Sequence, residues 1–216
     1  MENQIRIIYE DDDLLALYKP NGILVEGVSS GEGTLSDWVK SQYHPGVRAL
    51  HRIDRDTTGL VLFAKNSKWN REFSEMFEKK RIRKEYWVIV NGNWDSRISK
   101  VESMIRRTED GKWENSSQQG KDAKTTFRVL GKSGSYTWLQ ALPKSGRTHQ
   151  LRLHCLKAGY PIIGDRFYSD DSTNPFLLHA RALALKHPAN EREIQVKADP
   201  PEFWQRWLRP FTDNLP

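Results

Sequence analysis

Short apolar or alternating runs recur along the chain, and they predict a structure rich in β-strands. Such runs occupy residues 4–9, 14–18, 60–64, 86–90, 124–130, 136–142 and 178–185. The acidic segment 10–13 predicts a turn between the first two runs, and Gly-Lys-Ser-Gly-Ser at 131–135 predicts a hairpin. We therefore expect strands to make up most of the regular structure.

Helical periodicity occurs in three places. Thr34 precedes a predicted helix with Leu35, Trp38 and Val39 on one face, because a threonine oxygen can cap a first turn. A second helix is predicted from near Asn66 or Ser67, with apolar residues at helical spacing: Trp69, Phe73, Met76 and Phe77. Residues 148–158 predict a third helix, ended by Gly159 in a left-handed conformation. Strands outnumber helices without regular alternation, which predicts an α+β fold with a largely antiparallel sheet flanked by helices and loops.

The organisation of the chain indicates one domain. No internal repeat, low-complexity tract or long linker interrupts the 216 residues, so we expect a single domain over residues 1–216. The most polar stretch, 108–124, predicts one long loop inside that domain. A chain of this length can bury a core without disulfides or a structural metal.

Composition narrows the environment and the kind of partner. The net charge of +6 favours a polyanionic partner such as nucleic acid, although many basic proteins bind none. The single cysteine, Cys155, allows neither an internal disulfide nor a cysteine-based zinc site, which fits a reducing compartment. Because the first residues lack a signal-peptide pattern and no apolar run reaches membrane-spanning length, we expect a cytoplasmic protein.

The stretch HRIDRDTTG at 51–59 carries the first candidate chemistry. Asp54 lies between Arg52 and Arg55, and nearby guanidinium groups favour an ionised carboxylate that can act as a nucleophile or base. The same residues are typical of a surface turn, in which Asp and Thr cap, Gly permits positive φ and the arginines pair at the surface. Judged alone, the stretch is more typical of such a turn.

A second candidate is the basic cluster KSGRTHQLRLH at 144–154. Gly146 and Thr148 predict a loop entering a helix, whose free N–H groups attract anions, so Arg147 can hold either a phosphate or a catalytic carboxylate. His149 and His154 are five positions apart and fall on different helix faces, so we expect no metal between them. The alternative interpretation is a solvated basic helix.

Tyr86 opens the run 86–90 directly after the basic segment 79–84. A tyrosine in this place is commonly a core residue with a wet hydroxyl, but it can also stack on an extruded base. The basic segment fits phosphate contacts, although such segments are usually only solvated. Neither feature decides the function alone.

Five blocks in order resemble the RluA family of pseudouridine synthases. They are IIYEDDDLLALYKPNGILV, HRIDRDTTGLVLFAK, KEYWVIVNG, KSGRTHQLRLHCLKAGYPIIGDRFY and LLHARALALKHP. In turn they are similar to the family's Lys-Pro opening segment, its HRLDxxTSG block, its tyrosine-bearing strand, its GRTHQ block with the following turn, and its closing strand. The resemblance implies the family's catalytic fold and an isomerase that converts uridine in RNA to pseudouridine. Within the family, the resemblance is to the short members without an appended S4 domain.

The resemblance also implies catalytic roles. Asp54 aligns with the family's catalytic aspartate, Tyr86 with the tyrosine that stacks on the target base, and Arg147 with the basic residue that pairs with the aspartate. Three positions differ mildly from the family pattern without replacing a charged catalytic group; they are Ile53, Thr58 and Tyr160.

Further residues are expected to contact the substrate. Arg52 matches the arginine that fills the gap left by the flipped base, and Ile163 is expected to supply apolar packing in the pocket. His149, Gln150 and Arg152 belong to the same block as Arg147 and are expected to bind substrate.

The expected partner is RNA, in the form of a tRNA or rRNA stem-loop, and we expect no cofactor, no membrane and a monomer. Two alternatives stay open at this point. One is an RNA-binding protein that keeps the fold without catalysis. The other is a glycosidase using Asp54 and Asp56 as its two carboxylates, although two positions in a tight loop need not face one site.

Overall fold

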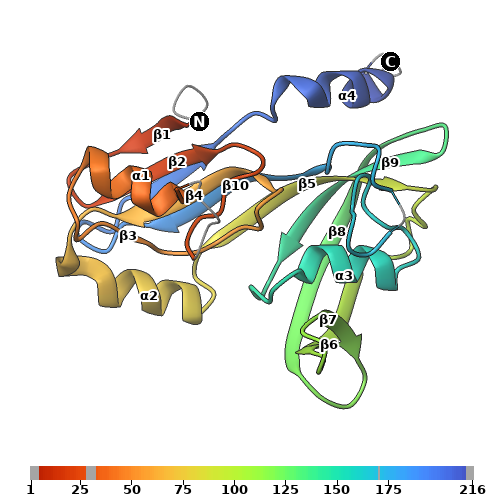
Figure 1. Ribbon diagram of the computed structural model, residues 1–216, viewed down its shortest axis with the longest axis horizontal. Coiled ribbons are helices and arrows are strands. Elements are labelled where there is room, and N and C mark those ends of the chain that lie inside the picture. Colours follow the sequence, from red (N-terminus) through yellow and green to blue (C-terminus); the bar gives the residue numbers. More distant parts are fainter. Residues whose placement is uncertain (1–4, 28–32, 170, 213–216) are drawn as a thin grey trace. The chain divides into compact units, whose positions relative to one another are not determined.

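The computed structural model describes residues 5–27, 33–169 and 171–212. The chain divides into two units (Figure 1). Unit 1 comprises Met1–Lys84 and His179–Pro201, and unit 2 comprises Glu85–Leu178 and Glu202–Pro216. Each unit is assembled from two separate segments of the chain. The expectation of one domain over residues 1–216 stays a prediction.

Unit 1 is built on strands in the order β1–β2–β4–β10–β11, with β3 also paired to β4. Their bounds are β1 (Arg6–Glu10), β2 (Leu14–Lys19), β3 (Arg48–Ala49), β4 (Thr58–Ala64), β10 (Leu178–Lys186) and β11 (Glu193–Lys197). β4 and β10 are parallel, and the other pairs are antiparallel. β2 and β4 are buried at every position, which explains their continuous apolar sequences.

Both predicted helices of unit 1 are present, and the predicted cap at Thr34 is confirmed. α1 (Leu35–Gln42) opens on a capping box, in which Thr34 Oγ1 accepts from the Asp37 N–H at 3.1 Å and Asp37 accepts from the Thr34 N–H at 2.9 Å. A 3₁₀ turn, η2 (Ser67–Trp69), leads into α2 (Asn70–Glu78), and the Asn66 side chain caps that turn. The apolar side of α2 packs into the core of unit 1.

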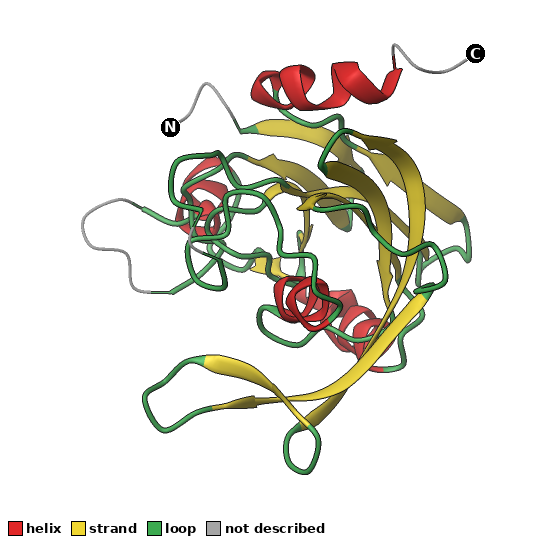
Figure 2. Ribbon diagram, turned by 90° about the vertical axis from the view of Figure 1, so that its right-hand side faces the viewer, coloured by secondary structure: helices red, strands yellow, loops and turns green. Residues whose placement is uncertain are grey.

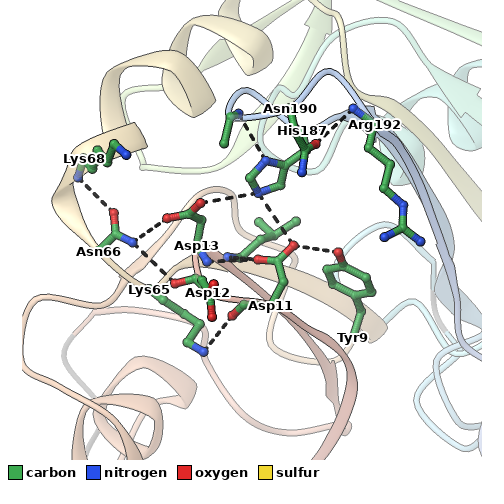
Figure 3. Close-up of polar contacts among 12 residues, drawn as sticks. Tyr9, Asp11, Asp12, Asp13, Lys65, Asn66, Lys68, His187, Asn190 and Arg192 are labelled. Atoms are coloured by element: carbon green, nitrogen blue, oxygen red, sulfur yellow. Dashed lines mark hydrogen bonds and ion pairs between the residues drawn. The ribbon is translucent and has the colours of Figure 1, made fainter.

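A cluster of polar side chains ties the β1–β2 turn to two other parts of unit 1 (Figure 3). Asp11 Oδ1 caps the turn by accepting from the N–H groups of Asp13 and Leu14. Asn66, at the start of η2, donates to Asp13 at 2.7 Å. His187, in the β10–β11 turn, lies 3.6 Å from Asp11 Oδ2 and 3.9 Å from Asp13 Oδ2. The cluster therefore joins three loops that are distant in sequence.

Unit 2 is built on antiparallel strands in the order β5–β9–β8–β6–β7. Their bounds are β5 (Arg83–Asn91), β6 (Lys100–Arg107), β7 (Trp113–Ser116), β8 (Lys121–Ser133) and β9 (Tyr136–Pro143). The helices of this unit are α3 (Gln150–Lys157), the 3₁₀ turn η3 (Glu202–Trp204) and α4 (Gln205–Thr212). The predicted third helix is thus confirmed as α3, and Gly159 after it has φ +87°.

The expectation of one long loop over residues 108–124 is wrong. β7 lies within this stretch and β8 begins there, so that β6, β7 and β8 form a ribbon (Figure 2, lower part). The ladder pairs Ile105 with Asn115 on one side and with Lys121 on the other. Every residue of β7 is half-buried and most are polar, so its sequence lacks the apolar alternation that indicates a strand. Backbone hydrogen bonds to β6 maintain this strand.

The fold class is confirmed: an α+β fold with a mixed, mostly antiparallel sheet and four helices. The predicted hairpin is also present, since β8 and β9 meet at a turn in which Gly134 has φ +55°. Among the residues that the structure describes, no helix is long and apolar enough to cross a membrane.

Candidate active site

Asp54 lies at the start of a tight turn that leads into the buried strand β4. The Thr57 N–H donates to the Asp54 carbonyl at 3.1 Å, which closes the turn. Asp54 is half-buried, whereas the neighbouring Arg52 and Arg55 are exposed. The predicted turn and the predicted site are therefore the same feature: a turn that presents one carboxylate between two solvated arginines.

A second segment of unit 1 holds this turn by its backbone. The Arg55 carbonyl accepts from the Gly22 N–H at 3.0 Å and from Lys19 Nζ at 2.7 Å. The Asn21 side chain donates to the Asp56 carbonyl at 2.8 Å. These bonds act on backbone atoms, so they fix the path of the turn that carries Asp54 and Asp56.

Lys19 is the buried cation beneath the turn. Its side chain is 0% exposed and also donates to the carbonyls of Pro20 and Ile23, each at 2.8 Å. Burial lowers the pKa of Lys19 to about 7, and the carboxylates of Asp56 and Asp54 partly oppose that shift. The charge of Lys19 therefore contributes to the electrostatic field at Asp54.

His51 anchors the other end of the turn. Its Nε2 accepts from the Leu62 N–H at 3.1 Å, and its ring packs against Phe77. Burial lowers the pKa of His51 to about 3, so the ring is neutral and can accept this bond. Hydrogen bonds therefore join the residues around Asp54 to β4 and to the C-terminal end of β2.

Tyr86 lies near the start of β5 in unit 2. It is half-buried, is paired with Ala141 of β9 and packs at the edge of the main core of the unit. This placement leaves part of the side chain at the surface, which is compatible with the stacking role expected for it.

Arg147 lies in the loop before α3, where its side chain donates to an uncharged backbone carbonyl. Its Nε donates to the Asp122 carbonyl at 3.1 Å, and its own N–H donates to Gln150 Oε1 at 3.1 Å. Gln150 is buried and also accepts from Ser145 Oγ at 2.7 Å. The structure thus brings Arg147 and Gln150 together, and Gln150 shapes the loop that carries Arg147.

Arg152 is the buried cation of unit 2. It is 4% exposed and forms a two-pronged ion pair with Asp165, which is 1% exposed; Nε lies 2.9 Å from Oδ2, and a terminal nitrogen meets Oδ1. Three rings surround the guanidinium, with centroids 4.8 to 5.1 Å away; they belong to Phe167, Tyr168 and Phe176. Such a pair is held firmly, because each charge is desolvated and fully matched.

The remaining predicted residues also lie in unit 2. His149 has φ +56° and its Nδ1 lies 2.7 Å from the Tyr168 hydroxyl, which itself donates to the Trp113 carbonyl. Ile163 is 4% exposed and packs in a core cluster with Ile89 and Leu177. Asp54 and Arg52 thus belong to unit 1, and the other predicted residues belong to unit 2.

Three residues that shape the surroundings of the predicted site residues were not singled out from the sequence. Lys19 was noted only as part of a Lys-Pro pair, and Asp165 and Phe167 only as letters in a block. A buried lysine next to a proline turn gives no apolar or catalytic pattern of its own. Asp165 could have been found by asking which acid neutralises an arginine on a largely buried helix.

Comparison with known proteins now decides the family. The model of a family described as RNA pseudouridylate synthase matches residues 13–157. The chain belongs to the RNA pseudouridylate synthase family. The matched span includes Asp54, Tyr86, Arg147 and Arg152, and it ends before Ile163.

Curated relatives of this family agree. The chain is 35% identical over 204 residues to ribosomal large subunit pseudouridine synthase C of Vibrio cholerae, covering 89% of this chain and 64% of that protein. It is 33% identical to the Buchnera aphidicola protein of the same name, covering 94% and 69%. A Borreliella burgdorferi protein named ribosomal large subunit pseudouridine synthase D is 37% identical, covering 92% and 66%. The chain thus spans about two thirds of the length of these relatives.

A solved structure extends the likeness to nearly the whole chain. Human RNA pseudouridylate synthase domain containing 4 superposes with a TM-score of 0.77 at 26% identity, covering 94% of this chain and 92% of that chain. Human RNA pseudouridylate synthase domain containing 1 superposes with a TM-score of 0.76 at 24% identity and supports the fold alone. The pseudouridine synthase fold of the family is therefore the fold of this protein.

Proposed function

We propose that this protein is an RNA pseudouridine synthase in which Asp54 is the catalytic residue. The reaction breaks the bond between C1′ and N1 of a uridine, turns the uracil and joins C1′ to C5. The proton of C5 is lost and N1 gains one, so the product is an isomer of the substrate. No electrons are gained or lost and no group is donated, so the chemistry requires no cofactor.

The observation that carries the proposal is the held backbone of the turn that carries Asp54. This turn is bound through the carbonyls of Arg55 and Asp56 by the 19–22 segment, and Lys19 adds a buried positive charge. A carboxylate carried on a fixed turn close to a buried lysine can initiate the reaction at the sugar or the base.

The other roles follow the family pattern. Tyr86 stacks on the target base and Arg147 neutralises the catalytic carboxylate, while Arg52 takes the place vacated by the flipped uridine. Ile163 contributes apolar packing. His149, Gln150 and Arg152 bind or orient the RNA, with Gln150 acting through the loop of Arg147.

For the substrate we propose ribosomal RNA, because the curated relatives are named for the large ribosomal subunit. The protein then acts in the cytoplasm as a monomer on a stem-loop. Extruding a uridine from its stack costs a few kcal/mol, which stacking and hydrogen bonds in the pocket must offset. Basic side chains elsewhere hold phosphates, so affinity decreases as salt increases.

The proposal is tested with Asp54→Asn on an unmodified large-subunit rRNA transcript. We expect pseudouridine formation to decrease by more than about 100-fold, because the group that initiates the reaction is lost. RNA affinity should change little, since the basic surface is retained. Asp56→Asn is the matched control in the same turn and should keep most of the activity. Full activity of Asp54→Asn would refute the assignment.

The substrate is identified by mapping pseudouridine in total RNA from cells with and without the gene. A uridine in large-subunit rRNA that loses its modification supports the proposal. A lost site in tRNA alone would move the substrate to tRNA. No difference at any site would favour an RNA-binding protein that keeps the fold.

A further inference from the structure

Phe167 is an aromatic side chain left in water. It is 67% exposed, more than any other large hydrophobic residue of the part of the chain that the structure describes. Most of its apolar surface is therefore left for a binding partner to bury. Single exposed apolar residues are common, however, and exposure alone indicates nothing.

The backbone of Phe167 is held in place by a buried network. Asp165 Oδ1 accepts from the Phe167 N–H at 3.0 Å and from the Tyr168 N–H at 3.2 Å. Asp165 is in turn clamped by Arg152 through the two-pronged ion pair. The segment that carries the exposed ring is therefore fixed by contacts that are themselves buried, which is unusual for a surface side chain.

The ring is supported by side chains as well. The Arg152 guanidinium lies 4.8 Å from the centroid of the Phe167 ring. The His149 ring lies 5.8 Å away at an interplanar angle of 49°. With these neighbours in place the residue is still 67% exposed. A ring that is fixed before binding loses little conformational freedom when a partner docks on it.

We propose that Phe167 is a stacking platform for an unpaired base of the RNA substrate; the inference rests on the proposed function. A planar nucleobase presents a π-face that an exposed phenyl ring accepts whatever the base. The platform is supported by Arg152 and His149, two residues already expected to contact the substrate. The base is one in a single-stranded part of that RNA.

The surroundings fit a base better than a protein surface. The preceding residue, Arg166, is exposed, and the ring's nearest charged neighbour is Arg152. Protein-binding hot spots are large apolar side chains within a wider desolvated patch. One ring among polar and basic neighbours matches a single base with its phosphate.

The test compares two probes at one salt concentration: a short oligouridine of about 12 nucleotides and an abasic strand of the same length. Both carry phosphates, but only the first carries bases. We expect Phe167→Ala to raise the Kd for oligouridine about 5- to 100-fold and to leave the Kd for the abasic strand unchanged. Phe167→Trp should retain wild-type affinity, and Phe167→Leu should resemble Phe167→Ala.

Leu156→Ala is the matched control, because Leu156 is 39% exposed on α3 and truncating it removes a similar apolar side chain. It should change neither Kd. The thermal midpoint of Phe167→Ala should equal that of the wild type. If that midpoint is lower, the comparison of Phe167→Trp, which keeps an aromatic ring, with Phe167→Leu, which does not, decides the test. Equal weakening for both probes, full affinity of Phe167→Leu, or a wild type that binds oligouridine no better than the abasic strand would overturn the proposal.

Turnover separates this inference from the proposed function. With an rRNA substrate, Phe167→Ala should raise KM and leave kcat at saturating RNA nearly unchanged. If the wild type forms no pseudouridine, the proposed function fails, and the base-dependent affinity still decides the role of Phe167. If the wild type is active and Phe167→Ala has an unchanged KM, only the stacking platform is refuted.

Discussion

At the scale of single residues, buried cations organise each unit. Lys19 in unit 1 is surrounded by three backbone carbonyls, which match the three protons of its ammonium group. Arg152 in unit 2 is matched instead by a carboxylate and three rings. The lysine holds the backbone of the turn that carries Asp54, and the arginine, through Asp165, holds the backbone of Phe167 and Tyr168.

Lys19→Met is expected to lower the free energy of unfolding by about 2–4 kcal/mol, because three buried carbonyls lose their donor. Activity should decrease further than stability explains, since the Asp54 turn loses the bond to the Arg55 carbonyl. Urea unfolding and initial rates on rRNA measure the two effects. Lys40→Met, at an exposed position of α1, is the control and should change neither. A fully active Lys19→Met variant would contradict the positioning role.

Arg152 and Arg147 are expected to respond differently to substitution. Arg152→Met leaves Asp165 buried without its cation and should lower the free energy of unfolding by about 3–5 kcal/mol. Arg147→Ala removes one bond to a carbonyl and should lower it by no more than about 1 kcal/mol, while the rate decreases markedly. Unfolding curves and rates on the same preparations check this. An unchanged rate for Arg147→Ala would exclude it as the cation at Asp54.

At the scale of elements, the close approach of β4 and β10 sets the position of the catalytic turn. Gly59 has φ +111°, and a Cβ there would lie 2.3 Å from the Ala180 carbonyl oxygen. Only glycine allows these parallel strands to meet, and the Asp54 turn leads directly into β4. The packing of β4 against β10 therefore explains the glycine of the TTG sequence at 57–59, in addition to the turn that precedes it.

Gly59→Ala should lower the free energy of unfolding by about 4 kcal/mol or prevent soluble expression, because backbone atoms of β10 cannot yield to the new methyl group. Gly33→Ala is the control, since its Cβ would meet only Asp37 Cβ at 3.9 Å. Chemical unfolding of both variants gives the comparison. Equal free energies of unfolding for Gly59→Ala and Gly33→Ala would show that β4 and β10 can move apart to accept the added methyl group.

Elements with a clear local pattern were predictable, whether or not their partners are distant in sequence. The cap at Thr34 depends on a neighbour three residues away, and β4 and β10 have apolar runs of their own. β7 depends on partners in β6, and its polar sequence has no strand pattern. The candidate site divides the same way. Asp54 was visible in a motif, whereas Lys19 binds a carbonyl 36 positions away and was not.

At the scale of the whole molecule, buried neutral histidines make stability depend on pH. Burial lowers the pKa of His154 and of His179 to about 4, against about 6.5 in an unfolded chain. His179 is held neutral between Thr58 and the Ala198 carbonyl. The unfolded state therefore binds more protons between these pH values. The contribution of these two rings to stability is complete above about pH 6.5 and decreases as pH falls toward 4.

We expect each of these rings to contribute up to about 3 kcal/mol of that decrease. His179→Gln should reduce the slope of stability against pH by about one proton, measured by urea unfolding between about pH 7 and pH 4.5. His44→Asn, at an exposed position, should leave the slope unchanged. Identical slopes for His179→Gln and the wild type would show that His179 is already protonated in the folded state.

The interleaving of the chain has a consequence for synthesis on the ribosome. β4 needs β10 as its parallel partner, and more than a hundred residues are translated between them. The segment Glu85–Leu178 emerges during that interval and carries most of β5 and all of β6, β7, β8 and β9. Until β10 is translated, the start of β4 at Thr58 and Gly59 lacks its parallel partner, so unit 1 stays incompletely paired while most of unit 2 is made.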